Sequence, residues 1–466
     1  MPVICLSLLL SLTANADLDG NAARELEPII SASDVQAQLV RYIGERITPL
    51  VLTGDAESQK ERADTLRELL LAEVIYKGVP GDWYQGPLEV EWTDTIETGK
   101  GYNIRKLRYE AVPGLWIAAV LYEPEQLEDK APAVLNVNGH VGPPGKGIQY
   151  EQIRCINLAK RGCLALHPEW LSFGELQGPD YGHNNLAWLD LCGVSGVSVF
   201  YQAMKRGLDV LMEHPSTDPD RVAMTGLSGG GWQTILLSAL DQRIRVSVPN
   251  AGYITLDQRM ENPGDIGDLE QSPVDMIAIA DYGDLTAMLA PRPALLIYNI
   301  HDDCCFQAPR ARKSVFELVT PVYEEFGAIG RFRFHENVDP GTHNYDLDNR
   351  LAFYAFLGEH FGLENPDEEL PTEGEILAPE DLHVGLPEDN ATFHTLATTA
   401  MAGLPHAPVA DVAREKLEAW RAAKRERLAE VLRYAPIPSE SVRFDSVDDS
   451  LKESQGLRVR QMRMNT

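Results

Sequence analysis

The feature that most constrains the fold of this chain is a Gly-x-Ser-x-Gly motif centred on Ser228. The apolar residues 222–224 before it predict a buried strand, and residues 233–240 after it carry apolar positions at helical spacing. A strand, a glycine-rich turn and a helix in this order are typical of a nucleophile elbow, which exposes the serine hydroxyl on a strained turn. The glycines leave room for the strand and helix to pass, and the helix presents its positive end. We therefore predict that Ser228 is a catalytic nucleophile.

Two neighbouring aspartates are candidates for the acid that such a nucleophile requires. A serine hydroxyl needs a base, and the base needs an acid that orients it. In folds built on this elbow, the acid follows the serine in the chain and the histidine comes last. The apolar residues 294–299 predict a strand, and Asp302 and Asp303 follow it. Because Asp302 lies three residues past the predicted strand end, we predict Asp302 as the acid and keep Asp303 as the alternative.

The histidine that completes the set is expected in a loop near the end of this region. Residues 331–334 predict a last strand, and a helical pattern follows about fifteen residues later, with His343 in the glycine-containing loop between them. The end of that strand lies at the same sheet edge as the elbow. We therefore predict that His343 is the general base. His335 and His360, at the strand and helix ends, are interpreted as structural or surface residues.

Two backbone N–H groups are needed to hold the negative charge that develops on a reacting carbonyl oxygen. One belongs to the residue after the nucleophile, which is Gly229. The second should follow an earlier strand, and the apolar residues 133–137 lead into a glycine-rich loop at residues 138–145. By its position in this loop, the N–H of His140 is predicted to be the second donor of the oxyanion hole.

These motifs together resemble those of the α/β-hydrolase superfamily and, more narrowly, those of bacterial acetyl xylan esterases and related carbohydrate esterases. The resemblance implies a mainly parallel, twisted sheet with helices on both faces. One departure is Asn138, where many members carry a histidine before the oxyanion-hole glycine. Since the donors are backbone groups, this change is not expected to abolish catalysis. The resemblance spans roughly residues 87–363 and rests on Asn138-Gly-His140, residues 221–230, Asp302 before Cys304-Cys305, and Gly341-Thr-His343.

Changes in composition along the chain suggest four parts. Residues 3–12 are apolar but too short to cross a bilayer, and the small residues Ala14 and Ala16 follow, as before a signal-peptidase cleavage site. We therefore expect a secreted or periplasmic protein. The predicted parts are a signal peptide (1–16), a helical N-terminal extension (17–86), an α/β-hydrolase catalytic domain (87–363), and a linker, amphipathic helix and tail (364–466).

The charge and cysteine content exclude several classes of partner. The 466 residues carry a net charge of −29, which argues against nucleic acid and against an anionic membrane surface. The spacing of the six cysteines matches no zinc motif. No metal or cofactor is expected, because an oxyanion hole already stabilises the charge that develops in ester hydrolysis. The sequence leaves open whether the protein forms a homo-oligomer.

The resemblance implies a secreted serine hydrolase that removes acetyl groups from plant or algal polysaccharide through an acyl-enzyme. The same triad cleaves methyl esters of uronic acids, as in pectin or glucuronoyl esters, so this alternative stays open. A serine peptidase of the prolyl oligopeptidase type shares the elbow and the order of the triad. Against the peptidase, no long repetitive β-rich region that could form a propeller precedes the catalytic domain. The partner we expect is therefore an ester-bearing carbohydrate.

Overall fold

The computed structural model divides the chain into two units, one of residues 40–404 and the other of residues 1–39 with 405–466. The predicted signal peptide, residues 1–16, lies outside the described residues. No described helix combines the length and apolar character that crossing a bilayer requires. The structure describes residues 31–127, 130–262, 265, 267–364, 366–405, 413–432, 434, 443–446, 452–454, 457–459 and 462–465.

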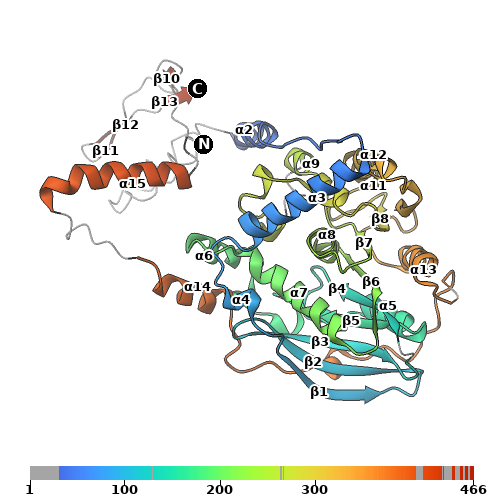
Figure 1. The fold of residues 1–466 in the computed structure, drawn as a ribbon. Coiled ribbons are helices and arrows are strands. Elements are labelled where there is room, and N and C mark those ends of the chain that lie inside the picture. The colour runs from blue at the N-terminus through green and yellow to red at the C-terminus, as the bar shows by residue number, and fades with distance from the viewer. Residues whose placement is uncertain are drawn as a thin grey trace. The chain divides into compact units, whose positions relative to one another are not determined.

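A single twisted sheet forms the centre of the larger unit (Figure 1). Its strands are ordered β1-β2-β3-β5-β4-β6-β7-β8-β9. The pairs β1–β2, β2–β3 and β3–β5 are antiparallel, and all later pairs are parallel. The strands are β1 (Val90–Glu97), β2 (Tyr102–Val112), β3 (Leu115–Pro124), β4 (Ala131–Val137), β5 (Leu164–Pro168), β6 (Thr217–Leu227), β7 (Val246–Asn250), β8 (Ala294–Asn299) and β9 (Phe332–Asn337).

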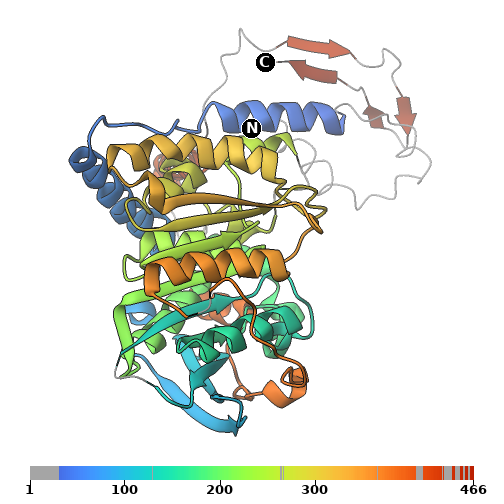
Figure 2. The same ribbon diagram turned by 90° about the vertical axis from the view of Figure 1, so that its right-hand side faces the viewer.

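Helices cover both faces of this sheet. Figures 1 and 2 show α5 and α13 on one side of the strands and α7 and α8 on the other. The predicted α/β architecture is therefore confirmed. The α-helices are α2 (Ala32–Gly44), α3 (Ala56–Leu70), α4 (Asp82–Gln85), α5 (Gln149–Lys160), α6 (Leu186–Leu191), α7 (Val197–Glu213), α8 (Gly229–Leu240), α9 (Leu256–Glu261), α10 (Tyr282–Ala287), α11 (Ala308–Ala311), α12 (Glu317–Glu325), α13 (Leu347–Phe361), α14 (Phe393–Ala402) and α15 (Leu417–Val431).

The burial of each strand follows from its place in the sheet. Every residue of β4, β5, β7 and β8 is buried, because helices pack on both faces of these central parallel strands. Strand β1 at the edge is mostly exposed. Apolar side chains from both faces join one core, so the central strands are held rigidly. Their carboxyl ends carry the loops in which the predicted site residues lie.

The segments before and after the sheet pack on the same unit. Before the sheet, Arg62 on α3 forms an ion pair with Asp284 of α10, at 3.0 Å between nitrogen and oxygen. After the last helix of the sheet, Asn390 accepts a hydrogen bond from the backbone N–H of Trp116 on β3 at 2.7 Å. Residues 366–404 thus belong to the larger unit, which contains the sheet.

The described part of the smaller unit contains α15 and two short antiparallel strand pairs. Strand β10 (Arg443–Ser446) pairs with β13 (Met462–Asn465), and β11 (Lys452–Ser454) pairs with β12 (Leu457–Val459). Helix α15 lies within the segment for which the sequence predicts an amphipathic helix.

A buried ion cluster supports the loop that follows β4. The ammonium group of Lys146 lies 3.1 Å from the carboxylate of Glu169 and also pairs with Glu175. Glu169 accepts a further hydrogen bond from the Lys146 backbone N–H, at 2.9 Å. Because the Glu169 side chain is fully buried, its charge depends on this lysine for compensation.

Replacement of this lysine should strongly destabilise the fold. We expect Lys146→Met to lower the free energy of unfolding by about 3–5 kcal/mol, because it leaves a buried carboxylate without its partner. Lys60→Met is the matched control, since the Lys60–Asp64 pair is largely exposed and such pairs contribute less than about 1 kcal/mol. Urea denaturation of both variants measures the difference, and equal losses would contradict this account of the cluster.

Candidate active site

Ser228 occupies the sharp turn between β6 and α8. Its backbone has φ 61° and ψ −121°, a conformation that a residue with a side chain rarely adopts. The serine N–H donates a hydrogen bond to the carbonyl of Asn250 at the end of β7, at 2.8 Å. The neighbouring strand therefore helps to hold the strained turn, which places the serine at the carboxyl edge of the sheet and at the start of α8.

Glycines at this turn are required by the close approach of β4. A Cβ atom on Gly226 or on Gly230 would lie 2.4 Å from the carbonyl oxygen of Val137. No side chain fits at that distance, and the obstacle is backbone that cannot rotate away. The two glycines of the motif are thus fixed by packing between the elbow and the neighbouring strand, as the sequence suggests.

The structure brings one of the two candidate aspartates to the imidazole ring of His343. The ring Nδ1 lies 3.0 Å and 2.9 Å from the two carboxylate oxygens of Asp302. Asp303 makes a different contact, because its carboxylate accepts a hydrogen bond from the backbone N–H of His343 at 3.0 Å. Asp302 thus orients the ring, while Asp303 anchors the loop that carries it.

Asp302 is held in place by its own local chain. Its carboxylate accepts hydrogen bonds from the backbone N–H groups of Cys304 and Cys305, at 3.0 Å and 2.9 Å, and from the side-chain amide of Asn299 at 3.0 Å. Burial opposes its ionisation, but the bond to His343 and these donors hold the pKa of Asp302 below its ordinary value. Asp302 is therefore ionised at neutral pH.

The contact with Asp302 shifts the pKa of the His343 ring in the opposite direction. Burial favours neutral His343, yet the hydrogen bond to ionised Asp302 and its negative charge raise the pKa of the imidazole above its ordinary value. The Nδ1–H donates to the carboxylate, so the neutral ring keeps its lone pair on Nε2. This is the tautomer in which a histidine can accept a proton from a hydroxyl group.

A cavity of 470 Å³ lies at the predicted site and is lined by Ser228, Gly229, His140 and His343. A Cβ atom on Gly139 would lie 2.9 Å from the Gly229 nitrogen, so the loop after β4 passes directly beside the elbow. Within the described residues, the Ser228 hydroxyl makes no hydrogen bond to His343.

A second hollow, of 530 Å³, lies between the N-terminal extension and helices α7 and α8. Its lining includes Arg67, Tyr76 and Arg243, but none of the predicted site residues. The 470 Å³ cavity is therefore the better candidate for the active site, because a serine hydroxyl group and an oriented imidazole ring both line it.

Comparisons with known proteins show what this chain is similar to. The model of the acetyl xylan esterase family matches residues 197–266, a stretch that includes the elbow. A comparison with curated protein sequences finds no match. A solved methylesterase superposes with a TM-score of 0.56 at 20% identity, over 80% of this chain and 80% of that chain. A glucuronoyl esterase from Solibacter usitatus superposes with a TM-score of 0.50 at 16% identity, over 68% of this chain and 100% of that chain.

The chain has the α/β-hydrolase fold. The structural likenesses establish the fold, and the family match at the elbow identifies a carboxylic ester hydrolase that resembles the acetyl xylan esterases. The predicted resemblance is thereby confirmed.

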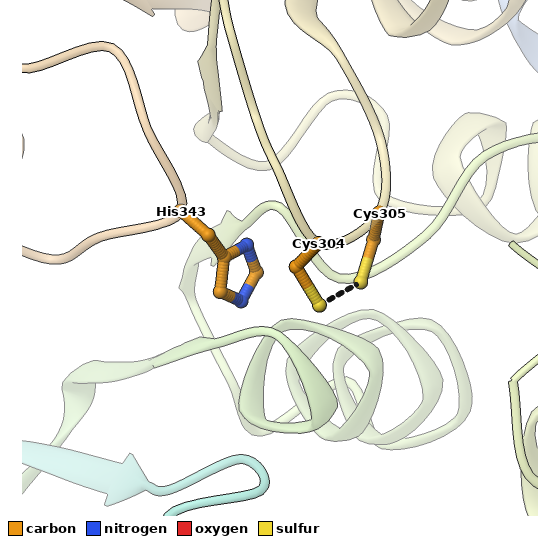
Figure 3. A group of neighbouring side chains, drawn as sticks. All are labelled: Cys304, Cys305 and His343. Atoms are coloured by element: carbon orange, nitrogen blue, oxygen red, sulfur yellow. Dashed lines mark hydrogen bonds between the residues drawn. The ribbon is translucent and has the colours of Figure 1, made fainter. Parts of the chain in front are cut away.

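Two adjacent cysteines form part of the hydrolase cavity beside the base. Figure 3 shows the His343 ring facing Cys304, with a hydrogen bond between the thiols of Cys304 and Cys305. Their sulfur atoms are 2.7 Å apart. This contact lowers the pKa of Cys304 to about 6 despite partial burial. The exposed Cys304 should therefore be a thiolate at neutral pH, while the pKa of Cys305 is raised.

Sequence reasoning missed a further set of residues next to His140. The hydrolase brings His140 together with His183, Asp268 and Glu270, and one ligand atom from each lies within 4.8 Å of the others. These residues come from three separate segments, and their spacing matches no metal motif. Only the folded chain reveals the cluster. Among the described residues, Cys304, Cys305 and His343 form the one other group of this kind.

The two remaining predicted histidines have structural contacts in the hydrolase. His335 lies 2.8 Å from the carboxylate of Asp348 at the start of α13. The ring of His360 packs against Phe356 one turn earlier on that helix. Neither residue lines the cavity of Ser228.

Alkylation should distinguish the two adjacent thiols. We expect iodoacetamide to label Cys304 first at neutral pH, with a rate that falls as the pH decreases through about 6, because protonation removes the nucleophilic thiolate. Peptide mapping by mass spectrometry measures the labelling of each cysteine. Cys304→Ser should abolish this early labelling. Faster labelling of Cys305 or Cys192, or a rate independent of pH, would contradict the assignment.

Proposed function

We propose that this protein is a serine esterase that removes acetyl groups from a plant or algal polysaccharide. The observation that carries the proposal is the contact of Asp302 with the His343 ring, at the cavity that also holds Ser228. In this proposal, Ser228 is the nucleophile, His343 the general base and Asp302 the acid that orients it. Gly229 and His140 supply the oxyanion hole through their N–H groups.

The first half of the reaction forms an acyl-enzyme. The Ser228 oxygen attacks the acyl carbonyl carbon while His343 Nε2 takes the hydroxyl proton, and the carbonyl oxygen becomes negatively charged. The N–H groups of Gly229 and His140 stabilise this oxygen, aided by the positive end of α8. The bond to the sugar oxygen then breaks, and His343 gives its proton to the departing alcohol.

The second half restores the enzyme. Water attacks the acyl carbon and gives a proton to His343, and the negative charge returns to the same oxyanion hole. The bond to Ser228 then breaks, the serine takes the proton back from His343, and the carboxylic acid leaves. Ionised Asp302 stabilises the imidazolium in both halves. The residues named here therefore suffice for this chemistry.

The surroundings of the site favour a neutral ester on a carbohydrate. The described residues that line the cavity include no lysine or arginine, so a polyanionic chain would find no counter-charge there. Tyr150 and Phe306 offer ring surface to a sugar. The family match points to the same class of substrate. A polymeric substrate of this kind lies outside the cell, so we propose that the protein acts as a secreted or periplasmic enzyme.

The alternative within the same chemistry is a methylesterase that acts on uronic acid esters. A methyl-esterified uronate is also neutral, so the cavity lining does not discriminate between methyl and acetyl esters. Two solved proteins with this fold are a methylesterase and a glucuronoyl esterase. The substrate test below therefore includes methyl esters. A peptidase activity is included there as a third outcome.

The two aspartates should differ in their effect on catalysis. We expect Asp302→Asn to lower kcat by about 10⁴-fold, because the amide favours the wrong tautomer of His343. Asp303→Asn, the matched control, should cost less than about tenfold, since its contact is with the backbone. Wild-type kcat/KM should fall as the pH decreases through the raised pKa of His343, and the residual activity of Asp302→Asn should have a lower apparent pKa.

Rates with p-nitrophenyl acetate across pH, with circular dichroism as a check on folding, measure both effects. If Asp303→Asn proves to be the more damaging change, Asp303 is the acid. Equal and small effects would remove both residues from the mechanism.

A substrate panel should identify the ester. We expect acetate release from acetylated xylan or a related oligosaccharide, with short acyl chains preferred, and a loss of at least about a thousandfold in Ser228→Ala. The panel compares acetylated xylan, methyl-esterified pectin, a glucuronate methyl ester and a proline-containing peptide amide, with chromatography of the products. Methanol release without acetate would replace the acetyl proposal by the methylesterase. Cleavage of the peptide alone would overturn the esterase.

A further inference from the structure

Three loops of the hydrolase converge on one group of nitrogen and oxygen ligands beside the cavity. His140 comes from the loop after β4, His183 from the turns before α6, and Asp268 and Glu270 from the segment after α9. His140 Nε2 lies 2.9 Å from an oxygen of Asp268. The Nδ1 of His183 lies 3.4 Å from the same oxygen and 3.1 Å from Glu270. The two imidazoles and two carboxylates thus surround one point.

The hydrogen bonds of His183 fix which of its ring nitrogens faces this point. Its Nε2 lies 2.9 Å from the carbonyl oxygen of Leu171. A carbonyl oxygen only accepts, so Nε2 carries the proton and donates it. A neutral ring then directs the Nδ1 lone pair at the carboxylates of Asp268 and Glu270, which is unfavourable unless a proton on Nδ1 or a metal cation lies between them. Metal-bound histidines are typically held in this way, with the second N–H donated to a backbone carbonyl or a carboxylate.

Glu270 supplies an independent observation. Its side chain is fully buried, and one of its two carboxylate oxygens, Oε2, has no hydrogen-bond partner among the described residues. A buried charged oxygen without a partner is costly. The rings of Trp170, Phe173 and Phe200 pack around His183, at centroid distances of 4.3–5.6 Å. This apolar surround lowers the local dielectric and strengthens the attraction of the carboxylates for a cation.

We propose that His140, His183, Asp268 and Glu270 bind one divalent transition metal ion, of which Zn²⁺ is the best fit. Two imidazole nitrogens and two carboxylate oxygens suit zinc better than calcium or magnesium, which prefer oxygen ligands alone. A tetrahedral ion with bonds of about 2.1 Å separates its ligand atoms by about 3.4 Å. Three of the ligand-atom separations are 2.9–3.4 Å and all of them are at most 4.8 Å, so the ion requires side-chain shifts that draw the more distant atoms together.

The other group of metal-ligating side chains is a weaker candidate. In Cys304, Cys305 and His343, the imidazole Nδ1 is already bonded to Asp302 and the thiols are bonded to each other. An ion there would also compete with the proposed general base. We therefore assign the metal to the four-residue cluster and use the cysteines as a control.

With four protein ligands the ion fills its coordination shell, so its role is structural. It would join three loops that are far apart in the sequence and fix the cavity wall formed by His140 and Asp268. Under the proposed function, it would also hold the backbone N–H of His140 in the oxyanion hole. No chemical step passes through the metal. The binding tests below do not depend on esterase activity, so they can fail or succeed separately from the proposed function.

Zinc binding can be measured directly on the whole protein without a histidine tag. We expect purified wild-type protein, stripped by a chelator and titrated with ZnSO₄ in a calorimeter, to bind one equivalent. The zinc-loaded protein should melt at a higher temperature than the stripped protein. Anomalous diffraction at the zinc edge should place a peak between the four side chains. This measurement needs no variant and remains informative if a substitution impairs folding.

Variants then test the ligands. His183→Phe and the nearly isosteric Glu270→Gln should weaken zinc binding by at least about tenfold, the range expected when a ligand or its support is lost. His335→Ala, which removes an exposed histidine–carboxylate pair, and the double variant Cys304→Ser/Cys305→Ser should bind zinc as the wild type does. The absence of zinc binding by the wild type would overturn the proposal and leave a proton on His183 as the cation. Unchanged binding in the His183 and Glu270 variants, or loss in the cysteine variant, would also overturn it.

Discussion

The tight passage of β4 against the turn between β6 and α8 is the constraint on which the site depends. The carbonyl of Val137 leaves no space for a side chain at Gly226 or Gly230. The same strand then continues into the loop of Gly139 and His140, which therefore emerges beside Ser228. One backbone contact thus sets both the strained turn and the position of the loop amides opposite it. The contact is buried within a rigid parallel sheet, so it can hold a conformation that an isolated turn would not adopt.

Two acidic groups contribute to the electrostatics at and beside the cavity. In the first, Asp302 takes its hydrogen bonds from its own loop and from His343, and it sets the tautomer of the ring. In the second, Asp268 and Glu270 surround His140 and His183. The first group orients the His343 ring. The second brings residues of three loops together and is the site at which we propose a metal ion. A net charge of −29 over the whole chain makes cation binding at such a point more favourable still.

The parts of the site that follow from local sequence could be predicted, and those that depend on distant loops could not. Ser228, Asp302 and His343 each lie at a fixed offset from a strand, so strand patterns alone placed them at one sheet edge. The sequence cannot show which of Asp302 and Asp303 contacts the His343 ring, because both residues lie on the same loop. His183 carries no local signal, since the other three residues of the cluster are more than forty residues away in the sequence. The fold class followed from the alternation of strands and helices, which reflects burial on both faces of the sheet.

The contacts of residues 366–404 extend the folded unit beyond the predicted end of the catalytic domain. The sequence resemblance stops near residue 363, yet beyond it Val384 and Gly385 donate backbone hydrogen bonds to Glu175, the partner of buried Lys146. Asn390 likewise accepts a hydrogen bond from the backbone N–H of Trp116 on β3. A fragment cut at the edge of the recognisable motif would therefore expose the ion cluster under the β4 loop to water. A fragment that keeps these contacts must extend beyond α13 at least as far as Asn390.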